Sequence, residues 1–164
     1  PQSPDCLFCP LAGSCSALSK GWVTKLPVKQ HKTKTTTRYF NYIYVRAGAY
    51  TFINKRTADD IWKNLFELPL IETSVALSEE EFLALPEFRE LVAEGEKPVV
   101  VRSVCREVKH VLSHRVIYAN FYEVTLPAES ASFGNYRKIK AEELQQNALT
   151  RLVHALIQIY VDSK

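Results

Sequence analysis

The stretch EVKHVLSHRVIYANFYEV, residues 107–124, contains two strand-like segments that meet at the pair Ser113-His114. Apolar residues alternate with polar ones up to Leu112, and a run of β-branched and aromatic residues resumes at Val116. Alternation of this kind is typical of a strand that buries one face and exposes the other. The stretch therefore predicts two adjacent strands with two polar side chains at their joint.

Outward from this joint, the chain predicts a mixture of strands and helices. Ser78 followed three residues later by Glu81 is a capping-box pattern, which opens a helix. Near the C-terminal end, apolar residues recur on one helical face: Leu149, Leu152, Val153, Leu156, Ile157 and Tyr160. The expected elements are a hairpin over 38–55, a strand over 61–73, a helix over 78–95 with a break at Pro86, strands over 99–112 and 115–126, and a helix over 140–161. This order predicts an α+β fold, a single domain with a mixed β-sheet flanked by helices.

Length and composition restrict the class of protein. A chain of 164 residues allows one well-buried core and is short for two independent domains. Its hydrophobic content of 46%, its charged content of 24% and its net charge of +3 are those of an ordinary globular protein, and they permit an anionic partner. No segment approaches the roughly 18 apolar residues of a membrane helix, and no secretory signal is visible. We expect a cytoplasmic protein without a membrane partner. Because the chain begins at Pro1 and contains no methionine, we also expect it to be a piece of a longer protein.

Three cysteines, Cys6, Cys9 and Cys15, lie close together within residues 1–20. Thiolates at such short spacing favour a soft metal or an iron–sulfur cluster. Zinc would need a fourth ligand, and no partner spacing for one occurs nearby. Three free thiols are the alternative interpretation.

The next segment, residues 21–37, is rich in lysine and has almost no apolar periodicity, which predicts an extended linker. The folded domain is then expected over 38–164. Basic residues in and next to the linker could contact an anionic partner: Lys25, Lys29, Lys32, Lys34 and Arg38.

The segment EEEFLALPEFRELVAEGEK, residues 79–97, resembles the Nudix hydrolase signature G-x5-E-x7-R-E-U-x-E-E-x-G-U, where U is apolar. The residues on register are Glu81, Arg89, Glu90, Leu91 and Glu94. Val75 replaces the opening glycine, Ala93 replaces one carboxylate of the glutamate pair, and Lys97 ends the frame. In the signature, a glycine-led loop and paired glutamates hold magnesium against a diphosphate. The resemblance therefore implies a Nudix-like fold without its chemistry.

Four further segments, in order, resemble those of the MutY family of adenine DNA glycosylases. Cys6-x2-Cys9-x5-Cys15 is similar to the last three ligands of the family's cluster loop C-x6-C-x2-C-x5-C, and Leu26-Pro27-Val28-Lys29 to the start of its interdomain linker. Residues 64–69, NLFELP, resemble N-L-W-E-F-P, and residues 110–114, HVLSH, resemble the H-x-F-S-H element of the family's C-terminal domain. Together these matches extend over most of the chain.

This resemblance implies a base-excision repair enzyme that removes adenine mispaired with 8-oxoguanine. The implied partners are double-stranded DNA that contains the 8-oxoguanine:adenine mispair and the N-terminal catalytic domain of the same chain, which would flip the adenine. The implied cofactor is a [4Fe-4S] cluster, which three cysteines cannot complete, so we expect no intact cluster in this sequence alone. Because the catalytic domain is not part of this sequence, we also expect no glycosylase activity from it. The residues implied for lesion recognition are Leu112, where the family has phenylalanine, Ser113 and His114. The residues implied for contacts with the DNA backbone are Lys25, Lys29, Lys32, Lys34 and Arg38.

Three alternatives stay open at this point. A magnesium-dependent Nudix nucleotide hydrolase would show diphosphate cleavage. A protein-interaction module would use its lysine-rich segment to dock an acidic partner. Ser113-His114 could also be an ordinary hairpin turn in which the hydroxyl bonds the local backbone.

Overall fold

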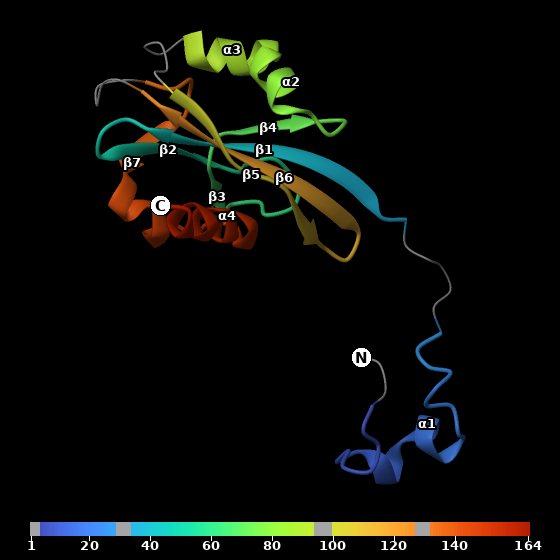
Figure 1. Ribbon diagram of the computed structural model, residues 1–164. Helices are drawn as coiled ribbons and strands as arrows, with labels where there is room; N and C mark the ends of the chain where they lie inside the picture. Colours follow the sequence, from blue (N-terminus) through green and yellow to red (C-terminus); the bar gives the residue numbers. More distant parts are fainter. Residues whose placement is uncertain (1–3, 29–33, 94–99, 127–131) are drawn as a thin grey trace. The chain divides into compact units, whose positions relative to one another are not determined.

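The computed structural model describes residues 4–28, 34–93, 100–126 and 132–164 (Figure 1). The chain forms two units, Pro1–Lys34 and Thr35–Lys164, and each is described by itself. The expected boundaries at residues 20 and 37 stay predictions. Lys29, Lys32, Glu94 and Lys97 lie outside the described residues.

In the N-terminal unit, the described residues contain two short helical turns, η1 (Ala12–Ser14) and α1 (Ser16–Ser19). Neither turn buries a residue. Leu7 is 92% exposed and Phe8 is 86% exposed, so this unit has little apolar core of its own.

The larger unit is built on a four-stranded sheet with the order β4-β1-β6-β5. Its strands are β1 (Thr36–Arg46), β4 (Leu70–Thr73), β5 (Val100–Val111) and β6 (Arg115–Thr125). β1 pairs parallel with β6, whereas β1 with β4 and β5 with β6 pair antiparallel. The expected mixed sheet is confirmed, and so are the two strands on either side of Ser113-His114.

A second sheet has the order β3-β2-β7, with β2 (Tyr50–Lys55), β3 (Phe66–Glu67) and β7 (Arg137–Lys140). The predicted hairpin over 38–55 is therefore wrong, although its turn is present. Ala47 and Tyr50 form a single bridge, and beyond it β1 and β2 belong to different sheets because their partners differ.

The single strand predicted over 61–73 is also wrong. Trp62 and Asn64 have φ angles of 61° and 70°, in the left-handed region that interrupts an extended strand. The segment instead forms a loop, the two-residue strand β3 and the strand β4.

Helices cover both faces of the main sheet (Figure 1). On one face lie α2 (Glu79–Ala84) and α3 (Pro86–Ala93), separated at Pro86 as expected, and the predicted capping box of Ser78 and Glu81 is confirmed. On the other face lies α4 (Arg151–Asp162), which follows the 3-10 helix η2 (Ala141–Gln146). The C-terminal helix starts later than predicted because the hydroxyl of Thr150 accepts a hydrogen bond from the Val153 amide at 3.2 Å and caps it there.

Alternate residues of β1 supply the two halves of the core. Phe40 and Tyr42 belong to the cluster under α4, and Ile43 and Val45 to the cluster under α2 and α3. All four are completely buried, which in general stabilises a fold by about 1.5–3 kcal/mol per large apolar side chain. Since β1 is buried on both faces, its register is fixed, and so is the position of its first residue beside the β5–β6 turn. In the described part of the chain, no helix is long and apolar enough to cross a membrane.

Candidate functional site

The turn between β5 and β6 is held by the backbone on two sides. The Leu112 amide donates to the Arg115 carbonyl at 2.8 Å and closes the turn. The Thr36 amide, at the start of β1, donates to the His114 carbonyl at 3.1 Å. Ser113 and His114 are both exposed, so this fixed backbone presents two polar side chains to solvent.

The Ser113 hydroxyl has no hydrogen-bond partner among the residues that the structure describes. An ordinary serine turn would use this hydroxyl to bond the local backbone, as Ser163 Oγ does by donating to the Tyr160 carbonyl at 2.8 Å. The turn thus leaves one donor and two acceptor lone pairs available for an external group.

Beside the turn lies a hollow of about 410 Å³. It is lined by Ile61, Trp62, Leu112, Ser113, His114 and Arg115. Leu112 is half-buried and packs against the core under α4, so it belongs to the wall of the hollow and not to the exposed tip.

A cluster of charged side chains supports this end of the domain. Asp60 is its centre: it accepts hydrogen bonds from Arg38 at 2.6 Å, from Arg56 at 3.2 Å, and from Arg115. The cluster joins β1, the loop before β3 and the first residue of β6. Burial alone would raise the pKa of Asp60, but the hydrogen bonds from Arg115 and Arg38 outweigh it and hold that pKa far below its ordinary value.

Arg38, expected as a DNA contact, is engaged elsewhere. Its guanidinium donates to both carboxylate oxygens of Glu72 at 2.6 Å, in addition to its bond with Asp60. Bidentate arginine–carboxylate pairs are among the strongest charged hydrogen bonds. A phosphate contact of Arg38 would require this pair to separate. By contrast, Lys25 and Lys34 are exposed.

The three N-terminal cysteines do not form a complete metal site. Cys6 and Cys15 are half-buried, Cys9 is exposed, and all three are free thiols. In the described ranges, no three side chains of Cys, His, Asp or Glu converge as metal ligands. An iron–sulfur cluster with cysteine ligands needs four thiolates. The three cysteines are therefore one ligand short of such a cluster.

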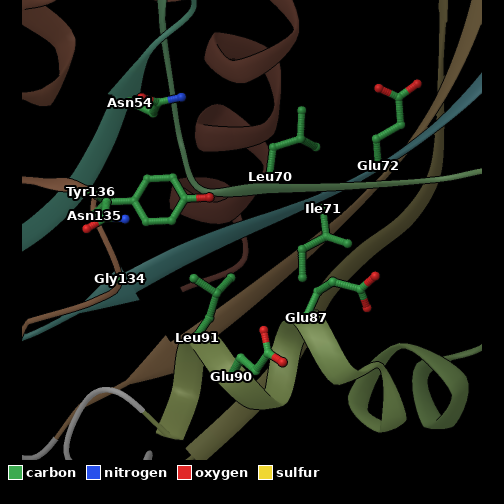
Figure 2. A pocket seen from close by; sticks show the side chains of 10 residues that line it. All are labelled: Asn54, Leu70, Ile71, Glu72, Glu87, Glu90, Leu91, Gly134, Asn135 and Tyr136. Carbon is green, nitrogen blue, oxygen red and sulfur yellow. The ribbon is translucent and has the colours of Figure 1, made fainter.

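The helical segment with the Nudix-like pattern borders a separate groove of about 610 Å³ (Figure 2). Figure 2 shows Glu87 and Glu90 on α3 on one side and Glu72 on β4 on the other. Glu81 is used structurally: its carboxylate accepts from the Ser78 amide at 2.7 Å, and this bond lowers its pKa. The groove is acidic, in contrast to the turn.

Sequence reasoning brought Ser113 and His114 to one place but missed three residues around them: Asp60, Trp62 and Arg115. Asp60 and Trp62 lie far from the turn in the chain, and Trp62 fell inside a segment that was expected to be a strand. Arg115 follows His114 directly, but its partner Asp60 does not. The left-handed backbone at Trp62 and the ion pair of Asp60 with Arg115 become visible only in three dimensions.

Comparisons with known proteins agree with this architecture. A family model described as NUDIX domain matches residues 41–158. The chain is 33% identical over 76 residues to the adenine DNA glycosylase of Buchnera aphidicola subsp. Schizaphis graminum (strain Sg), which is 46% of this chain and 22% of that protein. It is 24% identical over 121 residues to the enzyme of Buchnera aphidicola subsp. Baizongia pistaciae (strain Bp), which is 73% of this chain and 31% of that protein. The chain thus spans less than a third of the length of these curated relatives.

Solved structures share the fold at low sequence identity. The C-terminal domain of mouse MUTYH, solved in complex with human PCNA, aligns with a TM-score of 0.60 and 17% identity over 76% of this chain and 88% of that one. The MutT protein from Methanosarcina mazei Go1 aligns with a TM-score of 0.55 and 13% identity over 81% of this chain and 99% of that one. The chain therefore belongs to the NUDIX domain family, and its Nudix-like domain is of the MutY adenine DNA glycosylase type.

Proposed function

We propose that this chain is the domain with which an adenine DNA glycosylase recognises 8-oxoguanine opposite adenine in duplex DNA. One observation carries the proposal: an exposed serine hydroxyl without a described partner, on a turn whose backbone is fixed by two hydrogen bonds. The similarity to adenine DNA glycosylases gives this turn its substrate class.

The chemistry of the lesion matches this turn. Guanine presents N7 as an acceptor in the major groove. Oxidation at C8 converts N7 into an N–H donor and adds a carbonyl oxygen. A reader of this edge must accept from N7–H, and the Ser113 hydroxyl can accept while it donates to a neighbouring oxygen. The free amide groups of the turn would add further donors.

The fixed backbone contributes to affinity because little conformational entropy is lost when the turn binds. The Thr36 amide holds the His114 carbonyl and so fixes the backbone from which the imidazole projects. From there His114 would contact a phosphate or brace the turn. Leu112 would stabilise the turn from the wall side through its packing against the core.

Affinity that does not depend on sequence would come from the lysines of the linker. Phosphate contacts position a protein on DNA, and each contact releases counterions. We assign this task to Lys25, Lys29, Lys32 and Lys34. Arg38 would join them only if its bond with Glu72 opened.

The remainder of the enzyme belongs to the same proposal. The longer protein would supply a catalytic domain that flips the adenine and hydrolyses its glycosidic bond, and a [4Fe-4S] cluster to which Cys6, Cys9 and Cys15 would contribute. The chain described here would recognise the opposite base, and its residues would take no part in the hydrolysis. A Nudix hydrolase is not favoured, because Val75 and Ala93 replace the loop glycine and one glutamate of the signature.

The test is binding of the 164-residue chain to two duplexes that differ only in one base, 8-oxoguanine or guanine opposite adenine, at one salt concentration. The wild-type chain should prefer the oxidised duplex, and Ser113→Ala should reduce that preference. Ser103→Ala, on β5 away from the turn, is the matched control and should leave the preference unchanged. Equal affinity of the wild-type chain for both duplexes would refute the proposal.

A further inference from the structure

Trp62 occupies an unusual place beside the recognition turn. Its φ angle of 61° lies in the left-handed region, which is uncommon for a bulky aromatic residue and persists only where the surroundings hold it. Here the neighbours are aromatic: the indole lies 5.7 Å from the His110 ring and 6.4 Å from the Phe40 ring, centroid to centroid. The side chain is half-buried, and its remaining surface lines the hollow.

The charges of the side chains that line the hollow determine which groups it can bind. Among the lining residues, the guanidinium of Arg115 is paired with Asp60, and His114 lies at the exposed turn. The other walls are Ile61 and Leu112, which are apolar. Phosphate would find no free cationic side chain deep in this hollow, whereas an uncharged planar group would find an indole and aliphatic carbons. The volume of about 410 Å³ is also that of a small-ligand site.

We propose that this hollow binds the nucleotide adjacent to the oxidised guanine in the same DNA strand, with the base and sugar lying against Trp62. The inference rests on the proposed function, because Ser113 and His114 belong to both the recognition turn and the hollow. When the hydroxyl reaches the lesion, the neighbouring nucleotide is the group that is close enough to enter. The contact is made to a face that all bases share, so it adds affinity without reading the lesion.

Binding of the full 164-residue chain to the oxidised and undamaged duplexes tests the inference with three variants. Trp62→Leu removes the ring, Trp62→Phe keeps an aromatic face, and Tyr50→Leu removes a half-buried aromatic ring at the far end of the domain. Trp62→Leu should weaken binding to both duplexes by about five- to tenfold, the lower end of base–aromatic stacking. Trp62→Phe and Tyr50→Leu should stay within about threefold of wild type, and thermal melting identifies any variant that is unfolded.

A second measurement locates the contact without mutation. A 5-iodouracil base is placed next to the oxidised guanine, on either side, and the complex is irradiated. A crosslink from one of these positions to the peptide that contains Trp62 is expected, and none from a position five nucleotides away. The proposal is overturned if no neighbouring position crosslinks to this peptide, or if folded Trp62→Leu binds within threefold of wild type.

The two proposals fail separately. If Trp62→Leu binds like wild type while Ser113→Ala lowers the lesion preference, the hollow is not a nucleotide site and the turn still reads the lesion. If the wild-type chain shows no preference but Trp62→Leu loses affinity for both duplexes, the hollow binds DNA and lesion recognition fails. Loss of the preference alone in Trp62→Leu would make the indole part of lesion reading and would overturn its assignment to the neighbouring nucleotide.

Discussion

The groove beside α3 and the β5–β6 turn differ in how their charged side chains are placed. In the groove beside α3, Glu87 and Glu90 are exposed carboxylates that face solvent. At the β5–β6 turn the acidic group Asp60 lies beneath the surface among arginines, and the exposed tip carries a hydroxyl and an imidazole. DNA phosphates would be repelled by the first region and tolerated by the second.

The Nudix architecture is kept although Val75 and Ala93 replace two residues of the Nudix signature. The helical side is held by packing: Phe82 stacks on Tyr122 with ring centroids 4.1 Å apart and planes 7° apart. Neither ring depends on the carboxylates of the Nudix signature. The packing of the helical side can therefore be kept when residues of the signature change.

The largest effect is expected from Phe82→Ala, which removes packing under α2 and α3 and does not touch the β5–β6 turn. The ring is fully buried, and its removal should reduce the free energy of unfolding by about 3–5 kcal/mol. Urea unfolding measures the loss. Glu80→Ala, at an exposed position of the same helix, should stay within about 0.5 kcal/mol of wild type. At temperatures where Phe82→Ala is folded, its lesion preference should equal that of wild type; a lost preference would show that the two regions are coupled.

The next effect is expected from Asp60→Asn, which breaks the support of the turn. The change leaves the arginines around a partly buried position without the charge of their partner. The free energy of unfolding should fall by about 2 kcal/mol at neutral pH, which is less than for a fully buried pair. Urea unfolding again measures the loss. Asp59→Asn, one residue away with its side chain 96% exposed, is the control.

The pH dependence of Asp60 has a definite sign. Its pKa is lower in the folded chain than the ordinary value of about 3.9, so the unfolded chain binds the proton first as the pH falls. The stabilisation is fully present at neutral pH and is lost as the pH falls below about 4. Between pH 5 and pH 3, wild type should therefore lose more stability than Asp60→Asn. Parallel stability curves for the two proteins would contradict this.

A smaller effect is expected from Lys25→Gln and Lys34→Gln. If each lysine contacts a phosphate, each change should weaken binding to the oxidised and undamaged duplexes alike. The slope of log affinity against log salt should become shallower by about 0.9 for each phosphate that a variant no longer neutralises. Lys55→Gln, at an exposed position on β2, should leave the slope unchanged. An effect on only one of the two duplexes would mean that these lysines take part in lesion reading.

The smallest effect is expected from the double change Glu87→Gln and Glu90→Gln in the acidic groove. Both residues are exposed, so stability should stay within about 0.5 kcal/mol of wild type. Wild type and variant should both release no product from nucleoside diphosphate derivatives with magnesium. Turnover by wild type that the variant loses would favour a Nudix hydrolase.

Local patterns predicted the parts of the fold that depend on local interactions. The capping box at Ser78 and Glu81 lies within four residues, and the strands around Ser113 follow from alternation alone. The hairpin over 38–55 failed because the pairing of β1 is decided by β4 and β6, which lie far away in sequence. A pattern of strand-forming residues does not specify which partner a strand will take.

The candidate site was also predicted only where it depends on residues that are close together in the sequence. The exposed tip is a continuous stretch and was visible in the sequence. Its support is not continuous: Asp60 and Arg115 are 55 residues apart, and Arg38 and Glu72 are 34 apart. Arg38 was expected to contact DNA because it is basic and lies next to the linker. The sequence gives no sign that Glu72 on the neighbouring strand β4 binds it.

The most direct test removes the proposed hydrogen bond between N7–H of the oxidised base and the Ser113 hydroxyl, first by changing the protein and then by changing the DNA. Wild type and Ser113→Ala are each measured against duplexes with 8-oxoguanine and with an analogue in which carbon replaces N7, always opposite adenine and at one salt concentration. If the hydroxyl accepts from N7–H, each single change should weaken binding by up to about fivefold, or about 1 kcal/mol, and the double change should add almost nothing. If Ser113→Ala binds the two duplexes with the same ratio as wild type while its melting temperature is unchanged, Ser113 does not read the oxidised base and the central claim is wrong.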